Sequence, residues 1–215
     1  MEKNAPPQRT LPRIYLISSG KEHPENCTLL TEQLTLLPHS FPCMVQIREK
    51  QLNTRQLLTL ALKARQVTLP KETLLLINER LDIALAASLD GIHLPENACS
   101  ADILRPHAPK LLFGCSVHSE KSVRLAEESG AEYLLFSPIF DTPSKRQYGA
   151  PQGLKTLGKL CKTTPLPIFA LGGITLHSAA HCMAEGAYGI AGISMFQDLA
   201  RFVETLEQFH MITTS

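Results

Sequence analysis

Short runs of hydrophobic residues alternate with longer stretches in which hydrophobic positions recur at helical spacing. Runs such as LLLI at 74–77 and YLLF at 133–136 are continuously apolar, which is typical of parallel strands covered on both faces. The pattern predicts strands at 13–18, 43–48, 73–77, 91–94, 111–115, 132–136, 167–171 and 188–193. Amphipathic helices are predicted between them, including 54–66, 119–129 and 178–185.

The number and spacing of these units predict an α/β fold closed into a barrel. Eight strand–helix units in 215 residues match the size of a (β/α)₈ TIM barrel. An open doubly wound sheet also alternates, but eight evenly spaced units favour closure. Gly130 and Gly186 each end a helical pattern just before a strand, as a left-handed C-terminal residue does. We expect one barrel domain over residues 13–215, preceded by a flexible polar tail at 1–12.

Composition and charge argue against several classes of protein. The net charge is +1, with 21 basic and 20 acidic residues spread along the chain, so no nucleic-acid or membrane-surface partner is predicted. No apolar run reaches the roughly 18 residues of a membrane span, and the N-terminal segment lacks a signal peptide's apolar core. The six cysteines form no CxxC pair, which favours reduced thiols and a cytoplasmic location. The sequence leaves open whether the chain forms a homo-oligomer.

Polar residues on the second predicted strand point to the barrel mouth, because catalytic groups of such barrels lie at the carboxyl ends of the strands. With a period of two, Gln46, Arg48 and Lys50 lie on one face of CMVQIREK, whereas Val45 and Ile47 lie on the other. One interpretation is a structural polar layer, with Arg48 paired to a carboxylate inside the barrel. The other is a substrate or anion site at the mouth.

Further polar residues follow the third, fourth and fifth strands. Asn78 and His93 stand at strand ends, where each is as consistent with a turn former as with a binding residue. Ser116 and His118 follow an apolar run, and a histidine that titrates near neutral pH suits a proton shuttle.

The loop after the sixth strand has the chemistry of a phosphate or pyrophosphate site. In SPIFDTPSKRQYGAP, hydroxyl groups and positive charge come from Thr142, Ser144 and Lys145. An ordinary exposed polar loop is the alternative.

Two glycine-containing segments follow the seventh and eighth strands, where phosphate sites of these barrels are commonly built. Gly172 and Gly173 in ALGGIT allow backbone N–H groups to approach an anion. Ile193 and Ser194 in GIAGIS supply backbone and hydroxyl donors from the other side. Together these segments predict a small phosphorylated substrate.

His177 and His181 have the i,i+4 spacing of helical metal ligands. No third ligand is evident, and the helix is expected on the outside of the barrel. We therefore predict no metal site there.

The motifs QIREK, INER, DGIHL, GCSVHS, SPIFDTPSK, ALGGI and GIAGIS follow one another in this order. In this the chain resembles the thiamin phosphate synthase/TenI family, from about residue 14 to residue 196. The resemblance implies a (β/α)₈ barrel that acts on 4-methyl-5-hydroxyethylthiazole phosphate. In the synthases, this thiazole displaces pyrophosphate from hydroxymethylpyrimidine pyrophosphate with Mg²⁺.

The resemblance also implies roles for individual residues. Gln46, Lys50 and Asn78 match positions that contact the pyrophosphate side, and Ser116 matches a serine at the reacting centre. Matching residues in the loops after strands six to eight are expected to hold pyrophosphate (Thr142, Ser144, Lys145) and the thiazole phosphate (Gly173, Ile193, Ser194).

The chain departs from the synthase pattern where two aspartates bind Mg²⁺. Glu79 stands at the first position and Ala98 at the second, and Ala98 cannot bind a metal. We therefore expect a TenI-type thiazole tautomerase without metal or other cofactor, with His118 as acid/base. The alternatives are a synthase whose Mg²⁺ is held by Glu79 and Glu96, a non-catalytic binder of thiazole phosphate, and a generic phosphate-binding barrel isomerase.

Overall fold

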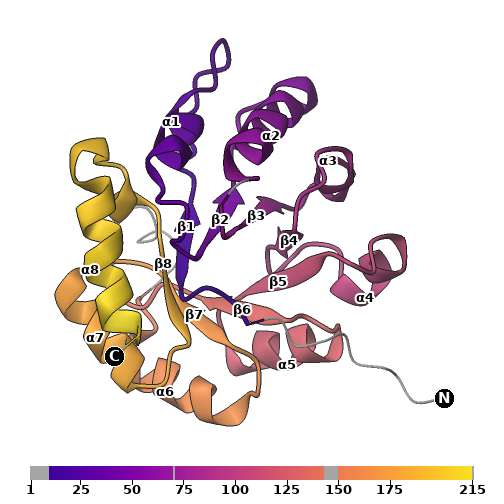
Figure 1. The fold of residues 1–215 in the computed structure, drawn as a ribbon. Helices are drawn as coiled ribbons and strands as arrows, with labels where there is room; N and C mark the ends of the chain where they lie inside the picture. The colour runs from indigo at the N-terminus through magenta and orange to yellow at the C-terminus, as the bar shows by residue number, and fades with distance from the viewer. Residues whose placement is uncertain (1–9, 70, 143–149, 215) are drawn as a thin grey trace.

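The protein is described by a computed structural model that covers residues 10–69, 71–142 and 150–214. Eight parallel strands pair in chain order, and β1 pairs with β8, so the sheet is a closed barrel surrounded by helices (Figure 1). The strands are β1 (Ile14–Ile17), β2 (Cys43–Ile47), β3 (Thr73–Asn78), β4 (Gly91–Leu94), β5 (Leu112–Val117), β6 (Tyr133–Phe136), β7 (Ile168–Ala170) and β8 (Gly189–Gly192).

The helices of the described residues lie outside the strands. They are α1 (Leu29–Leu36), α2 (Thr54–Thr68), α3 (Leu81–Ala86), α4 (Ala101–Leu104), α5 (Glu120–Glu128), α6 (Gly153–Thr163), α7 (Leu176–Ala184) and α8 (Phe202–Thr214). Short 3₁₀ helices are η1 (Arg105–His107), η3 (Ser194–Phe196) and η4 (Leu199–Arg201). No helix in this part of the chain is long and apolar enough to cross a membrane.

The predicted barrel is confirmed, and each predicted strand overlaps an observed one. The main difference concerns β5, which continues to Val117, so that Ser116 belongs to the strand itself rather than to the loop after it. The strand continues because its pairing with β6 extends through Ser116 and Val117.

Alternation along the strands separates two cores. Side chains such as Val45 and Ile47 pack between the sheet and the helices, whereas Met44 and Leu76 fill the barrel interior. Leu11 belongs to the interior cluster and is 5% exposed. The described packing therefore begins inside the segment predicted as a tail, of which residues 1–9 lie outside the described part.

Two carboxylates each join an arginine outside the barrel to the backbone of a strand. Asp90 Oδ2 lies 2.8 Å from both Arg65 Nη1 on α2 and the backbone N of Leu75 on β3. Glu132 Oε2 lies 2.9 Å from both Arg105 Nη2 and the backbone N of Phe113 on β5. Each carboxylate thus satisfies a strand N–H and an arginine together, which stabilises adjoining repeats.

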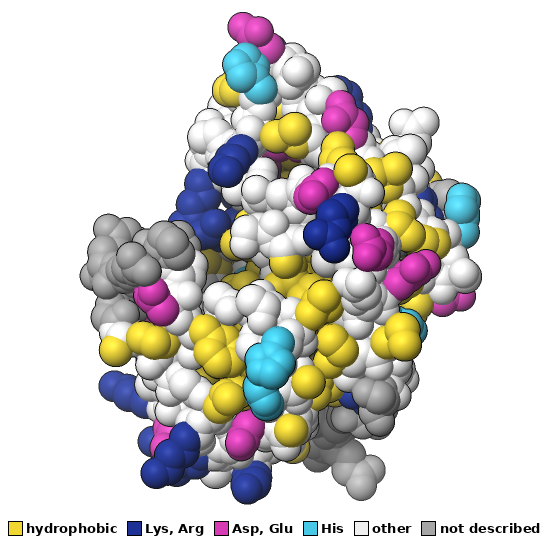
Figure 2. Space-filling model, turned by 90° about the vertical axis from the view of Figure 1, so that its left-hand side faces the viewer, with side chains coloured by type: hydrophobic (Ala, Val, Ile, Leu, Met, Phe, Trp, Pro, Cys, Tyr) yellow, Lys and Arg dark blue, Asp and Glu magenta, His cyan; other side chains and the backbone are white. Residues whose placement is uncertain are grey.

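The face on the left of Figure 1, turned toward the viewer in Figure 2, shows lysine, arginine, aspartate and glutamate interspersed with hydrophobic side chains. Mixed charge of this kind produces no strong field of one sign over the face.

We expect Asp90→Ala to lower the free energy of unfolding by about 1–3 kcal/mol, because it leaves the Leu75 N–H without its acceptor. Asp82→Ala is the control, because it removes an exposed carboxylate that pairs with Arg80, a type of pair worth less than about 1 kcal/mol. Urea unfolding measures both variants. Equal losses would show that the backbone hydrogen bond at Asp90 contributes nothing.

Candidate active site at the carboxyl end of the barrel

A chain of hydrogen bonds crosses the inside of the barrel. Gln46 Nε2 donates to the Tyr15 hydroxyl at 2.6 Å, and the Tyr15 and Tyr133 hydroxyls lie 2.9 Å apart. His93 continues the chain, with Nδ1 3.1 Å from the Tyr133 hydroxyl and Nε2 2.8 Å from Ser116 Oγ. We call these five residues, from β1, β2, β4, β5 and β6, the polar floor. Four of them are at most 1% exposed, whereas Ser116 is half-buried.

The polar floor is neutral throughout. Burial, followed by the nearby charge of Arg48, lowers the pKa of His93 to about 3, so its imidazole is uncharged at neutral pH. Burial also raises the pKa of Tyr15 and Tyr133 far above the ordinary tyrosine value, so both phenols keep their protons. A neutral chain avoids the cost of a buried charge.

Local sequence explains why the floor fits inside the barrel. The ring of Tyr133 occupies space that Gly114 leaves open, since a Cβ there would lie 1.9 Å from the ring. The phenol of Tyr15 packs edge-on against the rings of Tyr133 and Phe169. These contacts fix the two hydroxyl groups where the hydrogen bonds need them.

The structure separates the three residues predicted on one face of the second strand. Gln46 is buried in the floor, as the polar-layer interpretation predicts. Arg48 lies just beyond β2, half-buried, and makes no ion pair within the described part of the chain, so the carboxylate partner of the polar-layer interpretation is not found among those residues. Lys50 is exposed in the loop that follows.

Three floor residues were not predicted as site residues: Tyr15, His93 and Tyr133. The two tyrosines lie in runs that look uniformly hydrophobic, IYLI and YLLF. The available signal was their position, because both occupy the inward register of their strands. His93 stood out at the end of its strand, but a strand-end histidine alone does not indicate a hydrogen-bond partner.

His118 follows β5, is half-buried, and is held in one orientation. Its Nδ1 lies 2.6 Å from the carbonyl oxygen of Ser137, and its backbone N donates to Ser122 Oγ at 3.0 Å. Since a carbonyl oxygen only accepts, Nδ1 carries a hydrogen and the neutral ring keeps its lone pair on Nε2. That nitrogen is available to take a proton.

The loops after β6 and β7 are bonded to each other. Ile139 N donates to Leu171 O and Phe140 N to Gly172 O, both at 3.0 Å. Gly173 has φ +64°, and a Cβ there would lie 2.6 Å from the carbonyl oxygen of Asp141. Only glycine therefore fits at this position without moving the loop.

The other predicted phosphate residues differ in exposure and position. Ile193 is half-buried against the interior cluster, and Ser194 is exposed at the first position of η3. Thr142 is half-buried in the loop after β6. Ser144 and Lys145 lie outside the described residues.

The two positions at which the family resemblance implies Mg²⁺-binding aspartates supply one carboxylate here. Glu79 is exposed, has φ +61°, and its Oε2 accepts a hydrogen bond from Asn78 Nδ2 at 2.9 Å. Ala98 packs against the hydrophobic core, and the nearby Glu96 is exposed. Within the described residues, no three histidine, cysteine, aspartate or glutamate side chains come together as a metal site.

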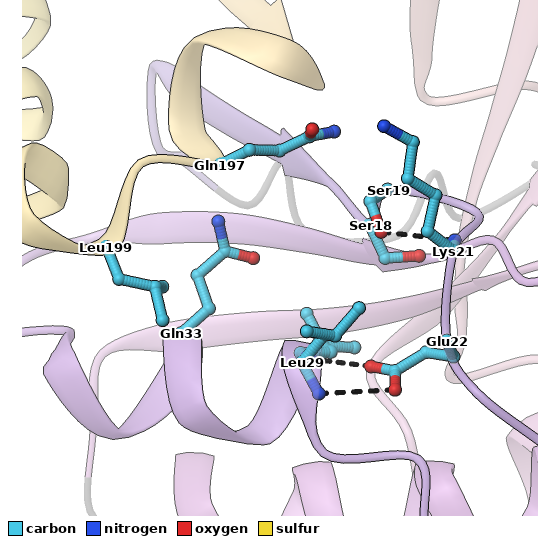
Figure 3. A pocket seen from close by; sticks show the side chains of 9 residues that line it. Ser18, Ser19, Lys21, Glu22, Leu29, Gln33, Gln197 and Leu199 are labelled. Carbon is cyan, nitrogen blue, oxygen red and sulfur yellow. Dashed lines mark hydrogen bonds between the residues drawn. The ribbon is translucent and has the colours of Figure 1, made fainter.

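A cavity of about 160 Å³ lies beside the mouth, between the loop after β1, helix α1 and the segment after β8 (Figure 3). Its lining includes Ser18, Lys21, Gln33 and Gln197, and the ends of Lys21 and Gln197 point toward one another across it. None of the predicted site residues lines this cavity.

The closed barrel and the polar residues at its carboxyl end define a (β/α)₈-barrel protein with a candidate small-molecule site in the usual place for this fold. The thiamine monophosphate synthase family matches residues 14–196. The chain belongs to this family and is therefore assigned to thiamine biosynthesis.

Individual relatives agree with this assignment. The chain is 44% identical to the putative thiamine-phosphate synthase 2 of Aquifex aeolicus, over 86% of this chain and 98% of the relative. It is 39% identical to the thiamine-phosphate synthase of Methanoculleus marisnigri, over 70% of this chain and 72% of that protein. Among solved structures, thiamine phosphate pyrophosphorylase from Pyrococcus furiosus aligns with a TM-score of 0.79 at 27% identity, covering 94% of this chain and 96% of that one. These names match the synthase alternative better than the predicted tautomerase.

We expect Gly173→Ala to weaken binding of thiazole phosphate at least about tenfold, because the new methyl group displaces the loop at Asp141. Gly153→Ala is the matched control, since Gly153 is also left-handed, at φ +76°, but a Cβ there would meet no atom within 4 Å. Isothermal titration calorimetry measures both affinities. A loss of the same size in both variants would contradict a phosphate role for the loop at Gly173.

Proposed function

We propose that this chain is a thiamin phosphate synthase, which joins hydroxymethylpyrimidine pyrophosphate to thiazole phosphate and releases pyrophosphate. The observation that carries the proposal is the division of the mouth into two chemically different halves. The polar floor ends at Ser116 on the side of β1 to β6, whereas the glycine loop and η3 follow β7 and β8. Two such halves give each substrate of a two-substrate reaction a place, and the relatives named thiamine-phosphate synthase support this reaction over the tautomerase.

In this proposal the thiazole phosphate lies against the loops after β7 and β8. Gly173, Ile193 and Ser194 offer backbone N–H groups and a hydroxyl to its phosphate oxygens. No lysine or arginine is among these three residues, so the phosphate is held by hydrogen bonds from neutral groups.

The pyrimidine pyrophosphate lies on the opposite half. Ser116 faces the reacting centre, and the pyrophosphate extends toward Lys50, Asn78 and Thr142, together with Ser144 and Lys145. The exposed Lys50 suits a leaving group whose negative charge grows as its bond breaks.

The synthase reaction requires Mg²⁺, which supplies charge neutralisation for the departing pyrophosphate. Mg²⁺ in proteins is bound by one or two carboxylates together with substrate phosphate oxygens and water. Glu79 and Glu96, exposed in the neighbouring loops after β3 and β4, would provide those carboxylates. This set differs from a pair of aspartates, because Ala98 contributes no oxygen and Glu96 lies two positions earlier in the chain.

A second candidate is the thiazole tautomerase, which one observation favours specifically. His118 is oriented by the contact of Nδ1 with Ser137 O, so that a neutral ring has its lone pair on Nε2, the arrangement of a residue that takes up and returns a proton. This reaction needs the thiazole phosphate half and His118, but neither Mg²⁺ nor a pyrophosphate loop.

We expect purified protein, given both thiamin precursors and Mg²⁺, to release pyrophosphate and form thiamin phosphate, and EDTA to abolish the release. Ala98→Asp adds a carboxylate at the second family position and should raise the rate at limiting Mg²⁺, whereas Ala98→Asn, with the same size and no charge, should raise it less. Absence of release beside an active control synthase would reject the synthase.

For the tautomerase, we expect His118→Gln to lower turnover by about 10²–10⁴-fold, the usual contribution of a general acid/base. Affinity for thiazole phosphate should stay within about twofold, because the phosphate loops are untouched. The conversion is followed by the absorbance change as the thiazole ring becomes aromatic. Unchanged turnover in this variant would remove His118 from the reaction.

A further inference from the structure

The hydrogen-bond chain of the polar floor has a direction, which follows from what each group can donate. The Gln46 amide nitrogen donates only, so the Tyr15 oxygen is an acceptor in that bond. The Tyr15 hydroxyl hydrogen then needs an acceptor of its own, and the Tyr133 oxygen, 2.9 Å away, is the partner in reach. Tyr133 in turn has its hydrogen free for His93 Nδ1.

The imidazole of His93 continues the same donor-to-acceptor order. A neutral imidazole has one N–H and one bare nitrogen, so accepting at Nδ1 places the hydrogen on Nε2. Nε2 then donates to Ser116 Oγ, 2.8 Å away. A charged ring would have two donors and would oppose the Tyr133 hydrogen. Burial and the Arg48 charge both keep the pKa of His93 low and prevent this.

The opposite direction leaves one buried hydrogen unsatisfied. If Ser116 donated to His93, then His93 would donate to Tyr133, and Tyr133 to Tyr15. The Tyr15 oxygen would then accept twice, and its own hydrogen would have no acceptor among the floor residues. An unsatisfied buried donor is costly enough to favour the first direction by about fivefold or more.

We propose that His93 is a positioning residue whose Nε2–H fixes Ser116 Oγ as an acceptor, so that the serine hydrogen is free to be donated to an acceptor atom of the substrate at the barrel mouth. Ser116 is the half-buried end of an otherwise buried chain, so its hydroxyl is the point where the floor meets the mouth. The part that concerns substrate rests on the proposed function, whereas the direction of the chain does not.

The direction is tested first, without any activity assay. Two-bond ¹H–¹⁵N spectra of the wild-type protein at neutral pH distinguish the protonated ring nitrogen of a histidine from the bare one. The chain has eight histidines, and the His93 signal is the one that disappears in His93→Gln. We expect His93 as the Nε2–H tautomer, with a mixture of tautomers in Tyr133→Phe, which removes the hydrogen offered to Nδ1. An Nδ1–H tautomer in the wild type would overturn the proposal.

The role at Ser116 is tested by rescue. The glutamine of His93→Gln places an amide N–H near the former Nε2, whereas His93→Leu has similar bulk and no donor. We expect His93→Leu to lower kcat about tenfold or more, as Ser116→Ala does, and His93→Gln to recover most of it, with thiazole phosphate affinity equal in all three. Equal kcat in His93→Gln and His93→Leu, or loss of affinity along with kcat, would overturn the positioning role. If the wild type lacks both proposed activities, the proposed function fails, and the tautomer spectrum still decides the direction of the chain.

Discussion

The arrangement of this protein depends on the hydrogen-bond chain inside its barrel. The interior of an eight-stranded barrel is packed with side chains and excludes water, so polar groups persist there only when they satisfy one another. Gln46, Tyr15, Tyr133 and His93 do so across four strands, and the chain ends at Ser116, where the barrel opens. The same bonds that make the interior stable therefore determine which atoms the mouth presents.

Hydrogen bonds between neighbouring parallel strands and their loops also fix the rest of the mouth. Asn78 lies beside His93 in the β3–β4 register, and the backbone N of Glu79 donates to His93 O at 3.0 Å. The loop that bears Glu79 is thus hydrogen-bonded to β4, the strand that bears His93. On the other side, the loops after β6 and β7 are bonded through Gly172 O. The two halves of the mouth are each fixed to the barrel by backbone hydrogen bonds rather than by side chains alone.

The barrel was predictable because its strands are buried on both faces, which leaves continuous apolar runs that need no knowledge of tertiary contacts. The candidate phosphate-binding loops were predictable for the same reason, since a glycine pair and a hydroxyl-rich segment differ clearly from those apolar runs. The polar floor could not be predicted, because a tyrosine inside IYLI or YLLF is taken as hydrophobic until it is known that its side chain points into the barrel. Pairing between Tyr15 and Tyr133, 118 positions apart in the sequence, is set by barrel closure and not by any local pattern. The surroundings of Arg48 were not predictable for a similar reason: a period of two gives the face of a residue, but the strand ends at Ile47, before that residue.

The two candidate reactions make different demands on the same mouth, and this explains why the names of relatives and the residues at the metal position point in different directions. A synthase must neutralise a departing pyrophosphate, and for that it depends on carboxylates that hold Mg²⁺ and on cationic loops. A tautomerase must only move a proton on a bound phosphate ester, and a single oriented imidazole is enough. Replacing an aspartate by Ala98 removes charge from the first function and leaves His118, Ser116 and the glycine loops untouched. Because the phosphate half and the polar floor suit either proposed reaction, the residues of the loops after β3 and β4 are the ones that distinguish the two proposals.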